Sequence, residues 1–180
     1  DAKTRWETPE RVVGRVGGQA MLLGTRGVSA SALGDNHFSD RGEIGNKDAD
    51  SMLTTLEIIE GKPDGSDAPG ENGDRAQMAK MISVMLSNNQ NCDDLYMNVN
   101  SGLTDISANW AKGYINYCYT LGVIAGRGNG TFDPSANVTA VEAAKLLLTA
   151  LGYEAEVEGL AGADWALTTA ALAHGVGVLA

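Results

Sequence analysis

Residues 126–153 read GRGNGTFDPSANVTAVEAAKLLLTALGY, a glycine-rich loop that leads into an amphipathic helix. Thr139 and Glu142 form a capping box, in which the hydroxyl accepts a backbone N–H three residues on and the carboxylate reaches back to the cap. The apolar residues after this cap recur at the i, i+3, i+4, i+7 spacing of one helix face: Ala143, Leu146, Leu147 and Ala150. The stretch therefore predicts a loop followed by a packed helix.

The three glycines of this stretch do not match a phosphate-binding loop. A Walker loop needs a lysine directly after its last glycine, and a dinucleotide fingerprint needs G-x-G-x-x-G directly after a strand. Here the glycines are Gly126, Gly128 and Gly130, no lysine follows them, and residues 131–138 separate them from the helix. The spacing therefore excludes the common nucleotide-binding motifs.

The same pattern occurs 65 residues earlier in the chain. Asp74 and Gln77 repeat the cap, and the register continues without a gap from residues 38–40, which correspond to residues 103–105. The earlier helix has its own apolar stripe, made of Met78, Met81, Ile82 and Met85. Agreement over about fifty residues indicates an internal repeat.

Each copy also contains a first helix that precedes the glycine loop. Its stripe consists of Gly45, Ala49, Met52, Leu53 and Leu56 in copy one, and of Trp110, Tyr114, Tyr117, Cys118 and Leu121 in copy two. A third stripe follows at an offset of 55, with Trp165, Thr169, Leu172, Ala173 and Val176, and stops before a glycine loop or second helix. Such short units cannot bury their own stripes, so we expect the stripes of copies one and two to face a shared core. We expect the third stripe to be covered by the first two copies, by the N-terminal segment or by another chain.

The repeats divide the chain into five segments and predict an all-α fold. The predicted segments are an N-terminal extension or degenerate signal-peptide-like segment (1–37), repeat 1 (38–86), an Asn-rich linker (87–102), repeat 2 (103–153) and a partial repeat 3 (154–180).

Composition excludes several classes of function. The net charge of −10 and the pI near 4.5 argue against binding to nucleic acid or to anionic membranes. The sequence contains no run of 18 apolar residues, so it predicts no membrane span.

Cys92 and Cys118 are the only cysteines, and they allow either a buried inert thiol at Cys118 or one disulfide between them. No catalytic, zinc or EF-hand spacing occurs, so we expect no enzyme, cofactor or metal site.

The repeats resemble the S-layer homology (SLH) family. The resemblance rests on FSD, LEIIEGKPDG and DRAQMAKMI in copy one, and on LTDISANWAKGYINYCYTLGVIAGRGNGTFDP and VTAVEAAKLLLTALGY in copy two. It implies three helical repeats around a pseudo-threefold axis, with grooves that hold an acidic, pyruvylated secondary cell-wall polysaccharide. It also implies an extracellular protein of the cell wall or S-layer, whose further partners are a second copy of the chain or the rest of a larger surface protein.

The resemblance also implies which residues bind the polysaccharide: Arg75, Trp110, Trp165, Asp40, Asp105, Gly122 and Gly177. At Arg75, free amides of the helix N-terminus would add to the attraction for a carboxylate. Copy one has Gly45 and Glu57, and copy two has Ala140, where the family has Trp, Gly and Arg. The alternative for the two tryptophans is core packing. The alternatives for the two aspartates are capping of the first helix and binding of a turn. The alternative function is a helical protein–protein interaction or assembly module without affinity for glycans.

Overall fold

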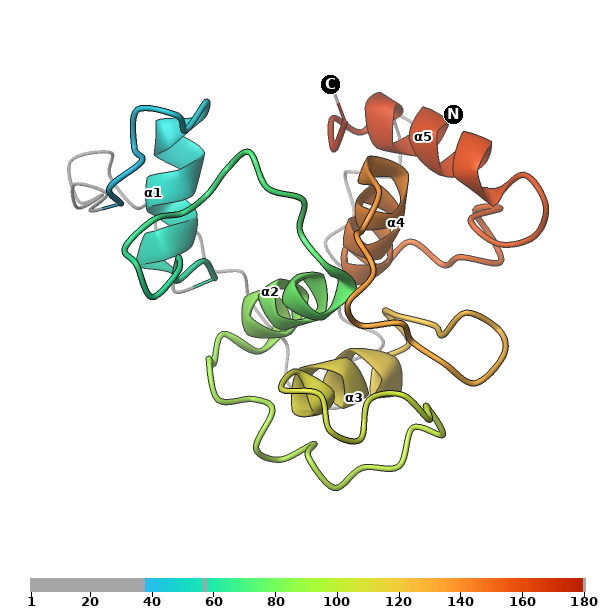
Figure 1. Ribbon diagram of the computed structural model, residues 1–180. Coiled ribbons are helices and arrows are strands. Elements are labelled where there is room, and N and C mark those ends of the chain that lie inside the picture. Colours follow the sequence, from blue (N-terminus) through green and yellow to red (C-terminus); the bar gives the residue numbers. More distant parts are fainter. Residues whose placement is uncertain (1–37, 57, 180) are drawn as a thin grey trace.

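The described part of the chain, residues 38–56 and 58–179 of this computed structural model, contains five α-helices and no β-strand (Figure 1). The predicted mainly α-helical class is confirmed. The helices are α1 (Lys47–Thr55), α2 (Arg75–Ser87), α3 (Lys112–Thr120), α4 (Ala140–Ala150) and α5 (Trp165–Gly175). The two interpretations of residues 1–37 concern residues outside this described part.

The second helix of each copy begins with a complete capping box. Asp74 accepts a hydrogen bond from the Gln77 N–H, and the Gln77 side chain accepts one from the Asp74 N–H. Thr139 and Glu142 make the reciprocal pair at the start of α4. Each box satisfies two backbone donors that a helix start leaves without intrahelical partners.

Three helices end in the same left-handed turn, which explains three of the glycines. Gly122 after α3, Gly152 after α4 and Gly177 after α5 have φ of 70°, 93° and 77°. In each case the glycine N–H and the next N–H return to carbonyls of the last helical turn, which is the Schellman arrangement. Gly122 and Gly177 therefore have a structural role in ending α3 and α5.

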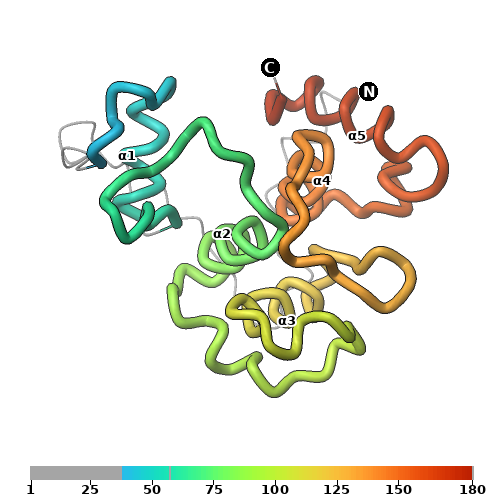
Figure 2. Tube along the Cα trace, in the orientation of Figure 1, coloured from blue at the N-terminus to red at the C-terminus, as the bar shows by residue number. Residues whose placement is uncertain are grey.

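The helices pack as two pairs that are joined through α2 and α4 (Figure 2). The α3 helix lies on α2, and α5 lies on α4. The α2–α3 cluster includes Ile82 and Ile115, and the α4–α5 cluster is built around Leu148, Leu160 and Ala173. Leu146 of α4 belongs to the first cluster and Leu148 to the second, so α4 is covered from two sides.

The third stripe finds its cover on α4. Thr169 and Ala173 of α5 are fully buried, and Leu172 and Val176 pack against the α4–α5 cluster. This cover is equivalent to that of α3 by α2, the second helix of the preceding copy. The expectation that the stripe would be buried is therefore confirmed.

The first stripe does not face a shared core, contrary to the expectation from the repeat. α1 belongs to neither packed pair, and Met52 and Leu56 remain 42% and 44% exposed. The helix is joined to the rest through Ile58, which packs on the α2–α3 cluster, and through the Glu60–Lys80 ion pair at 2.6 Å. The physical reason is that no described helix lies across this face of α1.

Both cysteines are free thiols and both are buried. Burial raises the pKa of Cys118 to about 12, so its thiol is protonated at neutral pH. Ser83 and Cys118 lie 3.1 Å apart within the α2–α3 cluster. None of the five described helices has the length and apolar character that a membrane crossing requires.

Candidate functional site

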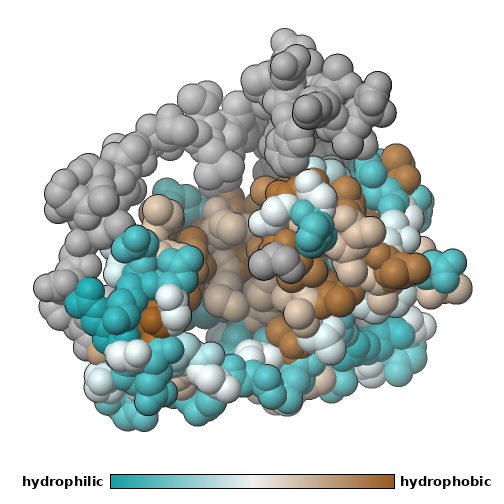
Figure 3. All heavy atoms as spheres, turned by 90° about the horizontal axis from the view of Figure 1, so that it is seen from above, coloured by the Kyte–Doolittle hydropathy of each residue, from teal (hydrophilic) through white to brown (hydrophobic). Residues whose placement is uncertain are grey.

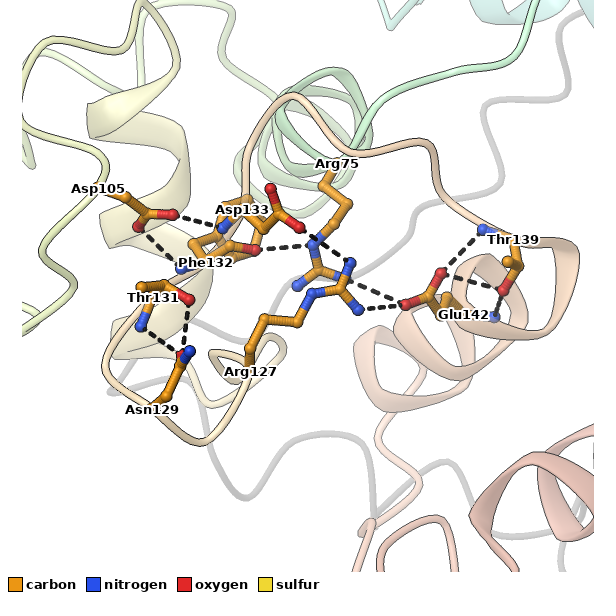
Figure 4. A network of polar contacts seen from close by, with 9 residues as sticks. All are labelled: Arg75, Asp105, Arg127, Asn129, Thr131, Phe132, Asp133, Thr139 and Glu142. Carbon is orange, nitrogen blue, oxygen red and sulfur yellow. Dashed lines mark hydrogen bonds and ion pairs between the residues drawn. The ribbon is translucent and has the colours of Figure 1, made fainter.

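The glycine loop of copy two is fastened by one carboxylate. Asp105 accepts the N–H of Phe132 on Oδ1 at 2.8 Å and that of Asp133 on Oδ2 at 2.7 Å (Figure 4). Burial opposes the charged form of Asp105, but these two N–H groups outweigh it, so the pKa of Asp105 is lowered. The bonds also hold Asp133 at a left-handed φ of 61°.

Copy one repeats this arrangement 65 residues earlier. Asp40 accepts the N–H groups of Asp67 and Ala68 at 2.9 and 2.7 Å, and Ala68 is left-handed at a φ of 57°. These bonds, above all the one from Asp67, lower the pKa of Asp40. The structure therefore places Asp40 and Asp105 as clamps of their own loops, and gives neither the role of a helix cap.

The start of α2 is docked on the loop of copy two. The N–H of Arg75 donates to the carbonyl of Ala136 at 3.0 Å, and the N–H of Ala76 donates to that of Pro134 at 2.9 Å. Asp74 and Asn137 form an isolated β-bridge beside this contact. The expectation of free amides at Arg75 is therefore wrong, because carbonyl groups of the loop occupy them.

The Arg75 side chain points into the protein. Its Nε donates to the carbonyl of Phe132 at 2.9 Å, and its guanidinium lies 4.5 Å from the centre of the Phe132 ring. Only 7% of the side chain is exposed, and Nη1 is 3.6 Å from Glu142 Oε1. Burial lowers the pKa of Arg75, and the nearby charge of Arg127 lowers it further. Arg75 therefore joins copy one to copy two.

The more accessible cation of this site is Arg127, a residue outside the set that the family resemblance implies. Its Nη1 donates to Glu142 at 2.7 Å, its Nη2 lies 3.7 Å from Asp133, and 35% of its side chain is exposed (Figure 4). One signal could have identified it: Lys62 occupies the same position in copy one. A guanidinium has five N–H donors, so Arg127 retains donors beyond its bond to Glu142.

The two tryptophans at the starts of the first helices are not core residues. Trp110 is 55% exposed and meets the ring of Tyr114 at 6.4 Å, so the alternative of core packing is wrong for this residue. Trp165 is half-buried, with the Lys145 ammonium 5.0 Å from its ring centre. An exposed indole offers a flat apolar surface and one N–H donor, which suit a sugar ring.

The described residues contain no group of three or more His, Cys, Asp or Glu side chains that could hold a metal ion. The loop instead offers carboxylates and guanidiniums that are paired with one another. Such a surface is suited to binding.

Comparison with known proteins connects this site with a family. The family model described as S-layer homology domain matches residues 102–144, which include α3, the glycine loop and the start of α4. The resemblance stated from the sequence is confirmed for this segment. No solved structure matches the chain.

Three relatives of the chain are named as proteins of the cell surface, the cell wall or the S-layer. It is 32% identical over 105 residues to a cell surface protein of Thermoanaerobacter kivui, which is 58% of this chain and 14% of that protein. It is 33% identical over 92 residues to an uncharacterized cell wall amidase of Bacillus anthracis, which is 51% of this chain and 16% of that protein. It is 29% identical over 113 residues to an S-layer protein of Bacillus licheniformis, which is 63% of this chain and 12% of that protein. The chain thus spans 12–16% of the length of these relatives.

Proposed function

Residues 102–144 belong to the S-layer homology domain family, and from this premise we propose that the chain is a noncovalent anchoring module of the bacterial cell wall. Its ligand is an acidic, pyruvylated secondary wall polysaccharide, it is extracellular, and it performs no chemistry. The family match carries this proposal, and the relatives named as cell surface and S-layer proteins support it.

The proposal includes an arrangement of the copies around a pseudo-threefold axis, with the boundaries 38–86, 103–153 and 154–180. Two observations support it. The α3 helix on α2 and the α5 helix on α4 are equivalent pairs in the repeat. The loop clamps by Asp40 and Asp105 recur at the same offset of 65 residues.

In this proposal Trp110 and Arg127 provide the contacts to the polymer. The exposed ring of Trp110 stacks on a sugar, and the remaining N–H donors of Arg127 bind the pyruvate carboxylate. Arg75 lies behind Arg127 and adds positive charge from within the protein. Asp105 keeps the loop that carries Arg127 in place.

Sedimentation with purified cell-wall sacculi tests the function. We expect the chain to sediment with sacculi that retain the secondary polymer and to stay in solution with sacculi from which the polymer has been extracted. Equal binding to both preparations would reject the polymer as ligand. Binding to neither would favour the alternative of an assembly module.

Titration of the isolated polymer tests the site. A charge-assisted hydrogen bond is worth roughly 1.5–3 kcal/mol, so we expect Arg127→Gln to weaken binding by about ten- to a hundredfold. Trp110→Ala should weaken it by about tenfold through loss of stacking. Leu95→Ala is the matched control, because Leu95 is 82% exposed and lies in the linker. Wild-type affinity in both site variants, with unchanged melting temperatures, would remove the site from the proposal.

A further inference from the structure

One aspartate of α1 is buried, although a carboxyl group is ordinarily charged at neutral pH. Asp50 is only 6% exposed, whereas Asp48, in the same first turn of the helix, lies on the surface. The Oδ2 atom of Asp50 has no hydrogen-bond partner among the residues that the structure describes. A buried carboxylate oxygen without a partner is costly while the group is charged. The position therefore favours the neutral carboxylic acid.

The second copy has apolar side chains where copy one has two carboxyl groups. Ile115 lies 65 residues after Asp50 and is fully buried, and Phe132 lies 65 residues after Asp67 and is 1% exposed. Seen from above, the α1 side of the molecule shows mainly hydrophilic residues, whereas apolar residues gather on the α4–α5 side (Figure 3). Copy one therefore has little apolar packing to offset the cost of a buried charge.

Two further carboxyl groups act on Asp50. Asp67 belongs to the glycine loop of copy one (residues 61–70), which passes beside α1 (Figure 1), and Asp40 clamps this loop. The N–H groups that Asp40 accepts lower its pKa, so Asp40 stays ionised. Burial raises the pKa of both Asp50 and Asp67, and the charge of Asp40 raises each of them further. Asp67 also raises the pKa of Asp50, and Arg41 acts in the opposite direction without preventing the rise.

We propose that a proton on Asp50 holds α1 against the glycine loop of copy one, and that ionisation of Asp50 loosens this contact. α1 belongs to no packed pair of helices, so no large apolar interface offsets the repulsion between Asp50 and the two other carboxylates. In copy two, Ile115 stands at the equivalent position and carries no charge. Copy one is thus a proton-sensitive unit beside a proton-insensitive one, whether or not the chain binds a polymer.

The direction of the pH effect follows from the raised pKa of Asp50. An aspartate in an unfolded chain has a pKa of about 3.9, so below about pH 4 the carboxyl group is protonated whether or not α1 is packed. Above this pH, ionisation is easier in the open helix, where water solvates the charge, than in the packed one. The stability of packed α1 is therefore full below about pH 4 and falls as pH rises through the raised folded pKa.

Hydrogen exchange of the full chain, followed by mass spectrometry and corrected for intrinsic rates, tests the proposal. Asp50→Asn has nearly the same shape as the wild type and is uncharged at every pH. Since one pKa unit corresponds to a factor of ten, we expect the α1 amides of Asp50→Asn to exchange about three- to tenfold more slowly than those of the wild type at pH 7. At pH 4 the two proteins should exchange at similar rates. Exchange in Asp50→Asn that is no slower than in the wild type at pH 7 would overturn the proposal.

Asp48→Asn is the matched control for this experiment. Both aspartates lie in the first turn of α1, where the helix dipole attracts a negative charge, but only Asp50 is buried. Asp48→Asn should therefore leave the exchange of α1 unchanged or make it faster at pH 7. If Asp48→Asn slows the exchange as much as Asp50→Asn does, the effect belongs to the net charge of the helix, and the proposal fails.

The titration of the carboxyl group itself provides a second measurement. Carbon-13 NMR of the full chain, labelled at its aspartates, should give Asp50 a midpoint above the ordinary value of about 3.9. This midpoint should be lower in Asp67→Asn than in the wild type, because one neighbouring charge is removed. Asp94→Asn, on the exposed linker, should leave it unchanged. A midpoint of Asp50 at or below the ordinary value would overturn the proposal.

Addition of calcium distinguishes a proton from a metal ion as the cation at Asp50. At ~5 mM, calcium chloride exceeds the dissociation constants of about 10⁻³ M that are typical of weak extracellular sites. We expect it to leave the exchange of α1 at pH 7 and the midpoint of Asp50 unchanged. Slower exchange of α1 in the presence of calcium would overturn the proposal in favour of a metal site.

Discussion

Asp105 shows at the scale of one residue how a loop without regular structure is held in place. Both of its carboxylate oxygens accept backbone N–H groups, from Phe132 and Asp133. Asparagine in its place has only one acceptor and would set an NH₂ group against a backbone donor. We therefore expect Asp105→Asn to lower the free energy of unfolding at pH 7 by about 1 kcal/mol.

The pH dependence of this effect follows from the lowered pKa of Asp105. A carboxyl group with a lowered folded pKa contributes stability above its ordinary pKa of about 3.9 and loses it as pH falls through the folded value. The difference between wild type and Asp105→Asn in urea unfolding should thus be full at pH 7 and shrink below about pH 4. Asp94→Asn, on the exposed linker, is the control that should show no difference. A difference that persists undiminished at low pH would contradict the charged clamp.

Glu142 shows at the scale of an element how one side chain can serve both a helix and a contact between copies. Its Oε2 completes the cap of α4, and its Oε1 bonds to Arg127 and lies near Arg75. Gln77 completes the cap of α2 without any charge, so glutamine is sufficient for capping. We expect Glu142→Gln to keep the cap but to lower the free energy of unfolding by roughly 1.5–3 kcal/mol, since two guanidiniums lose their shared carboxylate.

Loss of the α4 cap alone gives a reference value for the destabilisation expected from Glu142→Gln. Thr139→Ala removes the N-cap hydroxyl of α4 and should lower the free energy of unfolding by about 1 kcal/mol. Gln77→Glu is the reverse change on α2. It should leave the free energy of unfolding nearly unchanged, because none of the described cationic side chains bonds to Gln77. Chemical denaturation of the three variants decides the question. If Glu142→Gln costs no more than Gln77→Glu, the ion pairs with Arg127 and Arg75 contribute nothing to stability.

At the scale of the whole molecule, stability is distributed unevenly between equivalent helices. α1 (Lys47–Thr55) and α3 (Lys112–Thr120) have the same length and the same place in the repeat, but only α3 belongs to a packed pair. Helices with few buried apolar contacts open at a lower free energy than the core. We therefore expect the backbone amides of α1 to exchange with solvent at least tenfold faster than those of α3 in native-state hydrogen exchange. Equal protection of the two helices would mean that the stripe of α1 is covered in solution.

Features that depend on near neighbours in the sequence were predicted best. The caps at Asp74 and Thr139 were predicted because they need only residues three positions away. The alternation of stripes and loops also marked all five helices. Turn binding by Asp105 was one of the alternatives from the sequence, but its partners were not identified, because they lie 27 and 28 residues away.

Short-range hydrogen bonds and periodic apolar positions can be read directly from the sequence. The places of the helices, the starts of α2 and α4, and the family of the segment 102–144 could therefore be predicted without a structure. The tertiary structure was needed to show that Arg75 turns inward onto Phe132, 57 residues away, and leaves Arg127 as the more exposed cation. It also decided that the stripe of α3 is covered and that of α1 is not. Periodicity reports that a helix has an apolar face, whereas the identity of the partner depends on which other surfaces the folded chain brings to that face.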